Sequence, residues 1–194
     1  MSAVSVDPGV APAAPVRAVV ALGANLGDRG RTLQAAVRDL ADAERVELLA
    51  VSAVLENPAL KPDGLDASAP PYLNAVVLLR TGLAPLALLD VLLAVEQRHG
   101  RVRAEHWGDR TLDLDLIDYD GRVLDAPRLT LPHPRAHERD FVLVPWRQVD
   151  PDAVLPGYGR IDELPAAHPL GVGSDFGGTE SGGTEFGIGP EGAP

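Results

Sequence analysis

The apolar residues of this 194-residue chain follow two periods that alternate along the sequence, and this order restricts the fold more than any other feature. A half-buried strand repeats its apolar residues every second position, whereas a helix spaces them three and four apart. Helical spacing occurs in segments 31–43 and 85–100. Strand-like runs cover residues 16–22, 46–55, 72–80 and 112–119. The order is therefore strand, helix, strand, strand, helix, strand.

This order predicts an α+β fold of the ferredoxin-like βαββαβ type, in which one antiparallel sheet carries two helices on one face. We expect the domain to span residues 16–170, with C-terminal additions after the last strand. Residues 1–15 are small and interrupted by prolines, and residues 171–194 are glycine-rich and acidic. Neither end can bury enough apolar surface to fold, so both are predicted to be disordered.

Charge and cysteine content exclude several classes of function. The net charge of −11 argues against nucleic-acid binding, which depends on clustered Lys and Arg side chains. The absence of cysteine excludes thiol nucleophiles, disulfide frameworks and thiolate metal sites. No apolar stretch approaches the roughly 20 residues of a membrane helix, and the chain does not start like a signal peptide. We expect a cytoplasmic monomer that binds neither nucleic acid nor membrane.

The segment with the clearest chemical pattern joins a basic loop to an acidic strand. Within LDLDL, the two-residue period of a strand turns the leucines to one face and Asp113 and Asp115 to the other. A strand with one solvated face would show the same pattern. The loop just before it contains Arg101, Arg103 and Arg110, which could cover the acidic face.

Magnesium and polyphosphate together would explain this arrangement. Mg²⁺ prefers a few carboxylates together with water and substrate oxygens, and arginine offers forked donors to phosphate. In two-metal phosphoryl transfer the ions lie about 3.5 to 4 Å apart, which two neighbouring strand carboxylates can serve. The residues alone therefore favour metal-assisted phosphoryl chemistry. GANLGDR at 23–29 matches neither phosphate-binding glycine motif, and we interpret it as a tight turn between strand and helix.

Five segments carry a resemblance to a known family: ALGANLGDR, ENPAL, PYLNAVV, GRVRAEHWGDRTLDLDLI and LTLPHPRAHERDFVLVPW. Together they resemble the 6-hydroxymethyl-7,8-dihydropterin pyrophosphokinases of folate biosynthesis, over about residues 17–165. The resemblance implies a ferredoxin-like fold and two Mg²⁺ ions. It also implies transfer of a pyrophosphoryl group from ATP to the hydroxymethyl oxygen of the pterin, with release of AMP.

The resemblance also implies roles for individual residues. Asp113 and Asp115 would hold both metal ions, and Arg101 and Arg110 would act with them on the transferred group. The ATP contacts would be Glu96, Arg103, Arg128, Leu129, Thr130 and His133. The pterin contacts would be Asn57, Pro58, Leu60, Tyr72, Asn74, Trp107 and Phe141. Arg139 matches an arginine near the assembled site.

Two other functions remain compatible with the residues. A nucleotidyl transferase or cyclase can also carry two aspartates on a ferredoxin-like sheet, although it would need a surface for a second nucleotide or a nucleic acid. A ligand-sensing domain without enzymatic activity is the other alternative, and in it the two aspartates would be solvated strand residues. The identity of the products separates the three.

Overall fold

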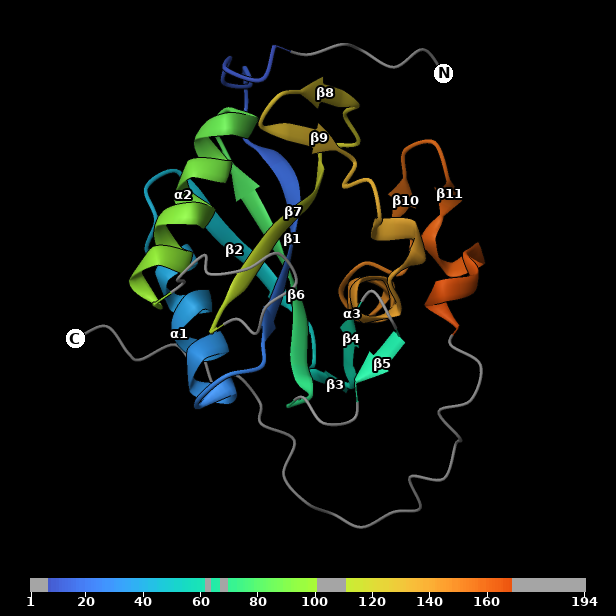
Figure 1. Cartoon of the computed structure of the whole chain (residues 1–194). Helices are drawn as coiled ribbons and strands as arrows, with labels where there is room; N and C mark the ends of the chain where they lie inside the picture. Colours follow the sequence, from blue (N-terminus) through green and yellow to red (C-terminus); the bar gives the residue numbers. More distant parts are fainter. Residues whose placement is uncertain (1–6, 62–63, 67–69, 101–110, 169–194) are drawn as a thin grey trace, which may run out of the picture.

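The computed structural model describes residues 7–61, 64–66, 70–100 and 111–168 (Figure 1). Its main sheet contains β1 (Val16–Ala24), β2 (Val46–Val51), β6 (Tyr72–Thr81) and β7 (Asp113–Tyr119). Their order across the sheet is β2, β6, β1, β7, and every neighbouring pair is antiparallel. The predicted ferredoxin-like arrangement is confirmed.

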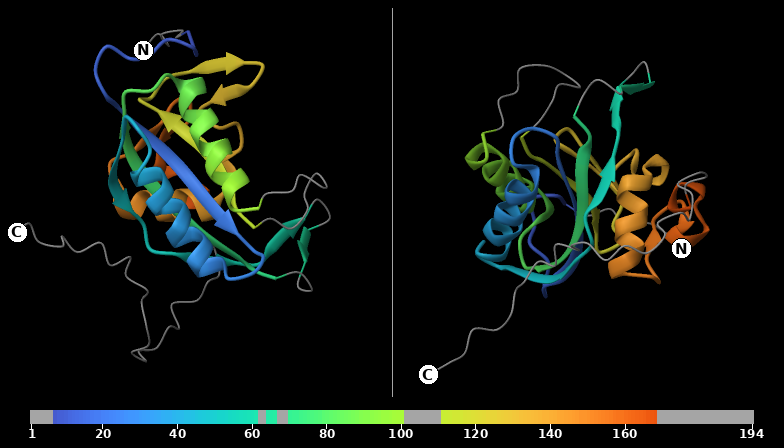
Figure 2. Two further views of the ribbon diagram at one scale, coloured as in Figure 1. Left: turned by 90° about the vertical axis from the view of Figure 1, so that its left-hand side faces the viewer. Right: turned by 90° about the horizontal axis from the view of Figure 1, so that it is seen from below.

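Two helices cover one face of this sheet, as the sequence order predicts (Figure 2). They are α1 (Arg29–Ala41) and α2 (Pro85–Arg98). Helix α1 begins after Asp28, whose carboxylate accepts a hydrogen bond from the Arg31 N–H at 3.1 Å, and α2 begins with a proline. The apolar stripes of both helices pack on the even-numbered residues of β1 and form one hydrophobic core, with Leu33, Leu88 and Leu92 fully buried.

The C-terminal additions cover part of the opposite face. Helix α3 (Asp140–Val149) lies against the sheet there, on the side away from α1 and α2 (Figure 2). Its buried residues Val142, Leu143 and Trp146 form a second core with side chains of the sheet such as Val76. After α3 follow β10 (Val154–Leu155), β11 (Gly159–Arg160) and two short 3-10 turns at Ile161–Glu163 and Pro165–Ala167. A third 3-10 turn, Ala136–Glu138, precedes α3.

A fifth, short strand completes the main sheet, and the described residues contain three further two-stranded sheets, one of which is β10 paired with β11. Strand β3 (Leu55–Asn57) pairs with the start of β6. The hairpins are β4 (Ala59–Lys61) with β5 (Gly64–Asp66), and β8 (Leu124–Ala126) with β9 (Leu129–Leu131). Residues 7–15, placed by sequence in the N-terminal extension, include a contact in which the Leu86 N–H donates to the Pro8 carbonyl at 3.1 Å.

The run predicted as one strand over residues 46–55 is divided into β2 and β3. At the break, the Ser52 hydroxyl accepts a hydrogen bond from the Val76 N–H at 2.9 Å, and the Ser52 N–H donates to the Val76 carbonyl at 2.9 Å. A side-chain oxygen thus replaces a backbone acceptor and lets the chain leave the regular ladder. Among the described residues, no helix is both long and apolar enough to cross a membrane.

Candidate functional site

The candidate site begins with a row of three residues across the central strands. Gly23 of β1 is the register partner of Asn74 on β6 and of Asp113 on β7. Directly paired residues of an antiparallel sheet point to the same face. The neighbouring Leu22 and Leu114 point into the core under α1 and α2, so the row lies on the opposite face, which α3 only partly covers.

Gly23 keeps space open in the middle of this row. A Cβ atom at this position would lie 3.1 Å from the Asn74 Oδ1 and 3.8 Å from the Tyr72 Cδ1. Sequence reasoning placed this glycine in a turn, but β1 continues through Ala24 and the turn begins after it. A glycine within a strand signals close approach of another group, and that signal could have identified the position.

Asp113 and Asp115 lie two residues apart on β7, both half-buried and on one face, as the strand period predicts. The Arg139 guanidinium donates to the Asp115 Oδ2 at 3.0 Å. It also lies over the Phe141 ring, 5.5 Å from the ring centre. Arg139 precedes α3 directly, so the packing of that helix brings a cation and an aromatic ring to the acid pair.

His133 reaches the same carboxylate. The backbone N–H of His133 donates to the Ile117 carbonyl at 2.8 Å, and the ring Nδ1 accepts from the backbone N–H of Arg135 at 3.2 Å. The other ring nitrogen, Nε2, lies 3.8 Å from the Asp115 Oδ2. Burial lowers the pKa of His133, although Asp115 opposes the shift. The neutral ring therefore carries its proton on Nε2, facing the carboxylate.

Glu96 holds the backbone between the two aspartates. This residue of α2 is fully buried, and its Oε1 accepts a hydrogen bond from the Leu114 N–H at 2.8 Å. The bond ties α2 to β7 at Leu114, the residue between Asp113 and Asp115. Sequence reasoning assigned Glu96 to ATP by resemblance and did not identify this structural contact.

The amide end of the row is built from β3 and β6. Asn57 is the register partner of Tyr72, and its Oδ1 accepts a hydrogen bond from the Asn74 Nδ2 at 3.3 Å. Asn74 is buried and Tyr72 half-buried. Pro58 follows β3 and is exposed. Two amides and an aromatic ring therefore meet at this end, which suits the flat, hydrogen-bonding edge of a heterocycle.

The other expected ATP contacts lie on the β8–β9 hairpin and have partners within the chain. Arg128 forms an ion pair with Asp90 of α2. The Thr130 hydroxyl lies 3.5 Å from the Asp125 Oδ1, and Leu129 is buried in the core beneath α2. Of the four expected ATP contacts between residues 128 and 133, His133 lies beside the acid pair.

Five of the predicted contact side chains lie outside the described part of the chain. Arg101, Arg103, Trp107 and Arg110 lie outside the described residues. Leu60 lies on β4, but its side chain is outside the described part as well. The predictions for these five residues stay predictions.

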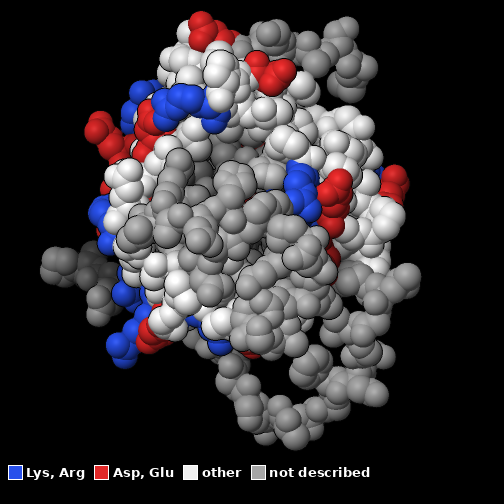
Figure 3. Space-filling view, in the orientation of Figure 1, with Lys and Arg blue, Asp and Glu red and all other residues white. Residues whose placement is uncertain are grey.

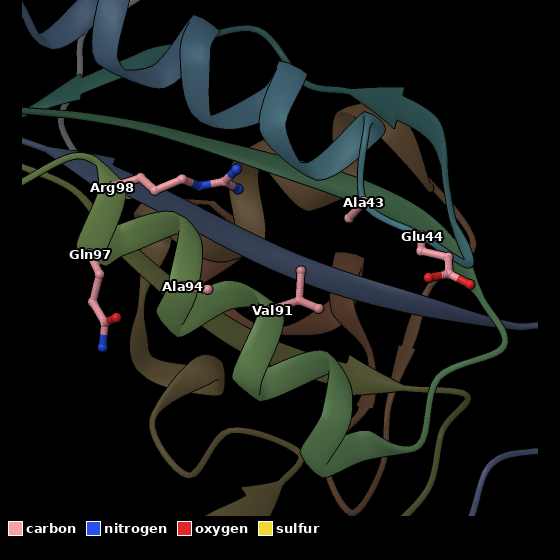
Figure 4. A pocket seen from close by; sticks show the side chains of 6 residues that line it. All are labelled: Ala43, Glu44, Val91, Ala94, Gln97 and Arg98. Atoms are coloured by element: carbon pink, nitrogen blue, oxygen red, sulfur yellow. The ribbon is translucent and has the colours of Figure 1, made fainter.

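A separate surface hollow lies between α2 and the segment that follows α1. It is lined by Ala43, Glu44, Val91, Ala94, Gln97 and Arg98 (Figure 4). This hollow belongs to the helical layer, whereas the acid pair lies on the other face of the sheet. On the molecular face seen in Figure 3, basic and acidic side chains lie near one another.

The structural comparison shows that the fold is shared with known proteins. One similar solved structure is a Plasmodium falciparum HPPK-DHPS triple mutant with pteroate, with a TM-score of 0.59 and 12% identity. The match covers 76% of this chain and 40% of the longer Plasmodium chain. A structure titled HPPK-DHPS in complex with substrates also gives 0.59, over 77% of this chain and 42% of the other. Fold and site together define the class, an α+β domain of ferredoxin-like topology with an acid pair on the open face of its sheet.

The sequence comparisons specify the family. A family model described as 7,8-dihydro-6-hydroxymethylpterin-pyrophosphokinase (HPPK) matches residues 19–151. A Synechocystis 2-amino-4-hydroxy-6-hydroxymethyldihydropteridine pyrophosphokinase is 42% identical over 169 residues, 84% of either chain. The Haemophilus influenzae protein of the same name is 39% identical over 77% of this chain and 91% of its own length. The chain belongs to the 7,8-dihydro-6-hydroxymethylpterin-pyrophosphokinase family, and the resemblance found in the sequence is confirmed.

Proposed function

We propose that the protein transfers the pyrophosphoryl group of ATP to the hydroxymethyl oxygen of 6-hydroxymethyl-7,8-dihydropterin, in folate biosynthesis. The hydroxymethyl oxygen forms a bond to the β-phosphorus, and the bond from that phosphorus to the oxygen bridging the α-phosphate breaks. AMP leaves, the hydroxyl proton is released, and the pterin diphosphate is formed. Membership of the family carries this proposal, with Synechocystis and Haemophilus relatives that bear the pyrophosphokinase name.

The two substrates would lie at opposite ends of the row. Neighbouring strands are about 4.8 Å apart, so β6 and β7 on either side of β1 are roughly 10 Å apart. This span accommodates a pterin over Asn74, Asn57 and Tyr72, with its hydroxymethyl group directed toward the phosphates. The phosphates would lie near Asp113 and Asp115. Phe141 and Trp107 would enclose the ring, together with Pro58 and Leu60.

The acid pair has the donor chemistry that Mg²⁺ requires. Both aspartates offer carboxylate oxygens on one face of β7. The described residues contain no group of three or more His, Cys, Asp or Glu side chains that could hold a metal ion. Two carboxylates with water and phosphate oxygens completing the shell is the arrangement Mg²⁺ prefers. We propose that Asp113 and Asp115 hold two Mg²⁺ ions. When bound, Mg²⁺ would neutralise phosphate charge and stabilise the charge that shifts during transfer.

The chain's own cations would complete the phosphate site. Arg139 already lies beside Asp115 and can offer the forked donors that suit phosphate. Arg101, Arg103 and Arg110 are proposed to clamp the triphosphate and act mainly in the transition state. Further proposed ATP contacts are Glu96, Arg128, Leu129, Thr130 and His133. Because transfer of this kind depends chiefly on positioning and charge, a strong general base is not required.

Several wider properties are also proposals. Residues 16–170 would form the catalytic domain, with the extensions at 1–15 and 171–194 outside it. The protein would act as a cytoplasmic monomer with two small-molecule substrates and would bind neither nucleic acid nor membrane. The relatives described above give no support to a nucleotidyl transferase, a cyclase or a ligand sensor.

Product analysis tests the proposal directly. Purified protein would be incubated with MgATP and 6-hydroxymethyl-7,8-dihydropterin, and the products separated by chromatography. We expect AMP and pterin diphosphate. Release of pyrophosphate would instead indicate nucleotidyl transfer, ADP an ordinary kinase, and no turnover a non-enzymatic domain.

An acid substitution with a matched control tests the metal assignment. Asp115→Asn should lower turnover by orders of magnitude while the protein stays folded. The control is Glu47→Gln, because Glu47 forms an exposed ion pair with Arg80, 2.9 Å away, at the far end of β6. Magnesium titrations of wild type and variant should then differ in the Mg²⁺ concentration needed for half-maximal rate. Equal titration curves would exclude Asp115 as a ligand.

A further inference from the structure

Arg29, the first residue of α1, connects three segments that border the candidate site. Its Nη1 donates to the Glu56 Oε1 at 3.0 Å and to the Pro71 carbonyl at 2.6 Å. Its side chain is 27% exposed, whereas that of Arg31, two residues later, is 88% exposed. The Arg29 guanidinium is therefore held in place, and its two acceptors come from residues 27 and 42 positions away along the chain.

Helix stability does not explain an arginine at this position. The N-terminal end of a helix carries partial positive charge, so a cation in the first turn is on the unfavourable end. No residue within the first turn of α1 is acidic, and the carboxylate of the capping residue Asp28 forms its ion pair with Arg31, whose Nε lies 3.4 Å away. The contacts that compensate the Arg29 charge are those to Glu56 and Pro71, outside the helix.

Both acceptors directly precede a proposed pterin contact. Glu56 is followed by Asn57, and Pro71 by Tyr72, and these two following residues are register partners on β3 and β6. Arg29 thus lies where the chain leaves β3 and returns into β6. Strand β3 has only three residues, so few ladder hydrogen bonds hold this junction. Helix α1 is anchored in the first core, which makes Arg29 a link from the junction to a buried helix.

We propose that Arg29 is a positioning residue for the pterin half of the site. It holds Glu56 and Pro71 so that Asn57 and Tyr72 are arranged beside Asn74 before the pterin binds. Arg29 itself does not contact the proposed substrate position. This inference rests on the proposed function, because it assigns the pterin to these residues. Pre-organisation lowers the entropy lost on binding, so its loss should weaken pterin binding selectively.

The test compares two substrates in one set of variants. Arg29→Met keeps the length of the side chain and removes its donors, and Arg29→Lys keeps the charge and can satisfy one acceptor. The control is Arg80→Met. Arg80 lies at the opposite end of β6 from Tyr72, and the change removes its exposed ion pair to Glu47 of β2. We expect Arg29→Met to raise the KM for pterin about tenfold, the size of one lost charged hydrogen bond. The KM for ATP and kcat should change less than twofold, and Arg29→Lys should recover part of the loss.

Binding measurements separate positioning from a general loss of structure. Calorimetric titration with the pterin, in the presence of a non-hydrolysable ATP analogue, should show the same weakening for Arg29→Met and little change for Arg80→Met. If Arg29→Met does not fold, Glu56→Gln retains the Pro71 contact and should weaken pterin binding by a smaller factor.

The possible failures are distinguishable. If the wild-type protein converts the pterin and Arg29→Met binds the pterin as tightly as the wild type does, the positioning role is overturned and the proposed function stays intact. An equal loss for both substrates would overturn it too, because it would indicate a structural defect. If the wild type neither binds nor converts the pterin, the proposed function fails and this inference fails with it.

Discussion

Asp118 is a buried acid that should make the stability of the protein depend on pH. It lies on β7 and is 7% exposed. Its Oδ2 accepts a hydrogen bond from the Gly121 N–H at 3.0 Å, while its Oδ1 is buried and has no hydrogen-bond partner among the described residues. Burial raises the pKa of Asp118 from 3.8 to about 6. Asp120 adds to the shift, and the Gly121 N–H and Arg17 oppose it.

The sign and size of the effect follow from linkage. Below the unfolded pKa both states are protonated, so the buried acid causes no pH-dependent loss of stability. As the pH rises from 3.8 toward about 6, the unfolded chain gives up its proton before the folded protein does, and stability falls. A shift of about two pKa units corresponds to roughly 3 kcal/mol, lost in full above pH 6.

Asp118→Asn should remove this loss. An amide can keep the Gly121 contact and carries no charge, so the variant should be more stable than wild type at pH 7.5, by up to roughly 3 kcal/mol less the cost of burying its NH₂ group. Near pH 4 the two proteins should be almost equally stable. The difference in free energy of unfolding should therefore grow between pH 4 and 7.

Urea unfolding followed by circular dichroism at several pH values measures the difference. At an m-value of about 2 kcal/mol/M, the transition midpoint at pH 7.5 should move by up to about 1.5 M. Asp152→Asn is the control, because the Asp152 side chain is 88% exposed and is not among the groups that shift the pKa of Asp118. A stability gain for Asp118→Asn that is the same at pH 4 and 7.5 would refute the reasoning.

Three further predictions concern the site. Arg139→Met should lower kcat/KM for ATP at least tenfold with little change in melting temperature, and an unchanged value would remove Arg139 from the phosphate site. Gly23→Ala should raise the pterin KM about tenfold, because its Cβ would lie 3.1 Å from the Asn74 Oδ1; an unchanged KM would show that Asn74 does not hold the pterin. Glu96→Ala should cost about 1–3 kcal/mol in thermal unfolding by leaving the buried N–H of β7 without an acceptor, and Glu96→Gln should cost less.

The order of the elements and the facing of the acid pair were predictable from sequence because each depends on local periodicity. The two-residue repeat around Leu114 determines that Asp113 and Asp115 share a face, wherever the strand lies in the sheet. The βαββαβ order has few compatible topologies, so the strand order follows nearly as directly. The resemblance supplied the substrates, which periodicity cannot supply.

The contacts that assemble the site were not predictable in the same way. Arg139 reaches Asp115 across 24 positions only because α3 packs on the second face of the sheet. Local pattern does not specify which face a C-terminal helix covers. Likewise, the extension of β1 through Gly23 is decided by pairing with two other strands, and this pairing overrides the turn preference of glycine.

The central place of β1 has a consequence for how the molecule responds to ligands. β1 is hydrogen-bonded to β6 on one edge and to β7 on the other, and residues 18–20 and 22 are buried. Its amide hydrogens should exchange with solvent only when the whole domain opens. The row that crosses Gly23 should thus lie on a strand that exchanges as slowly as any described part of the fold. Protection gained on ligand binding should therefore concentrate in the short strand β3, while the floor of the site exchanges at the rate of global unfolding with or without ligand.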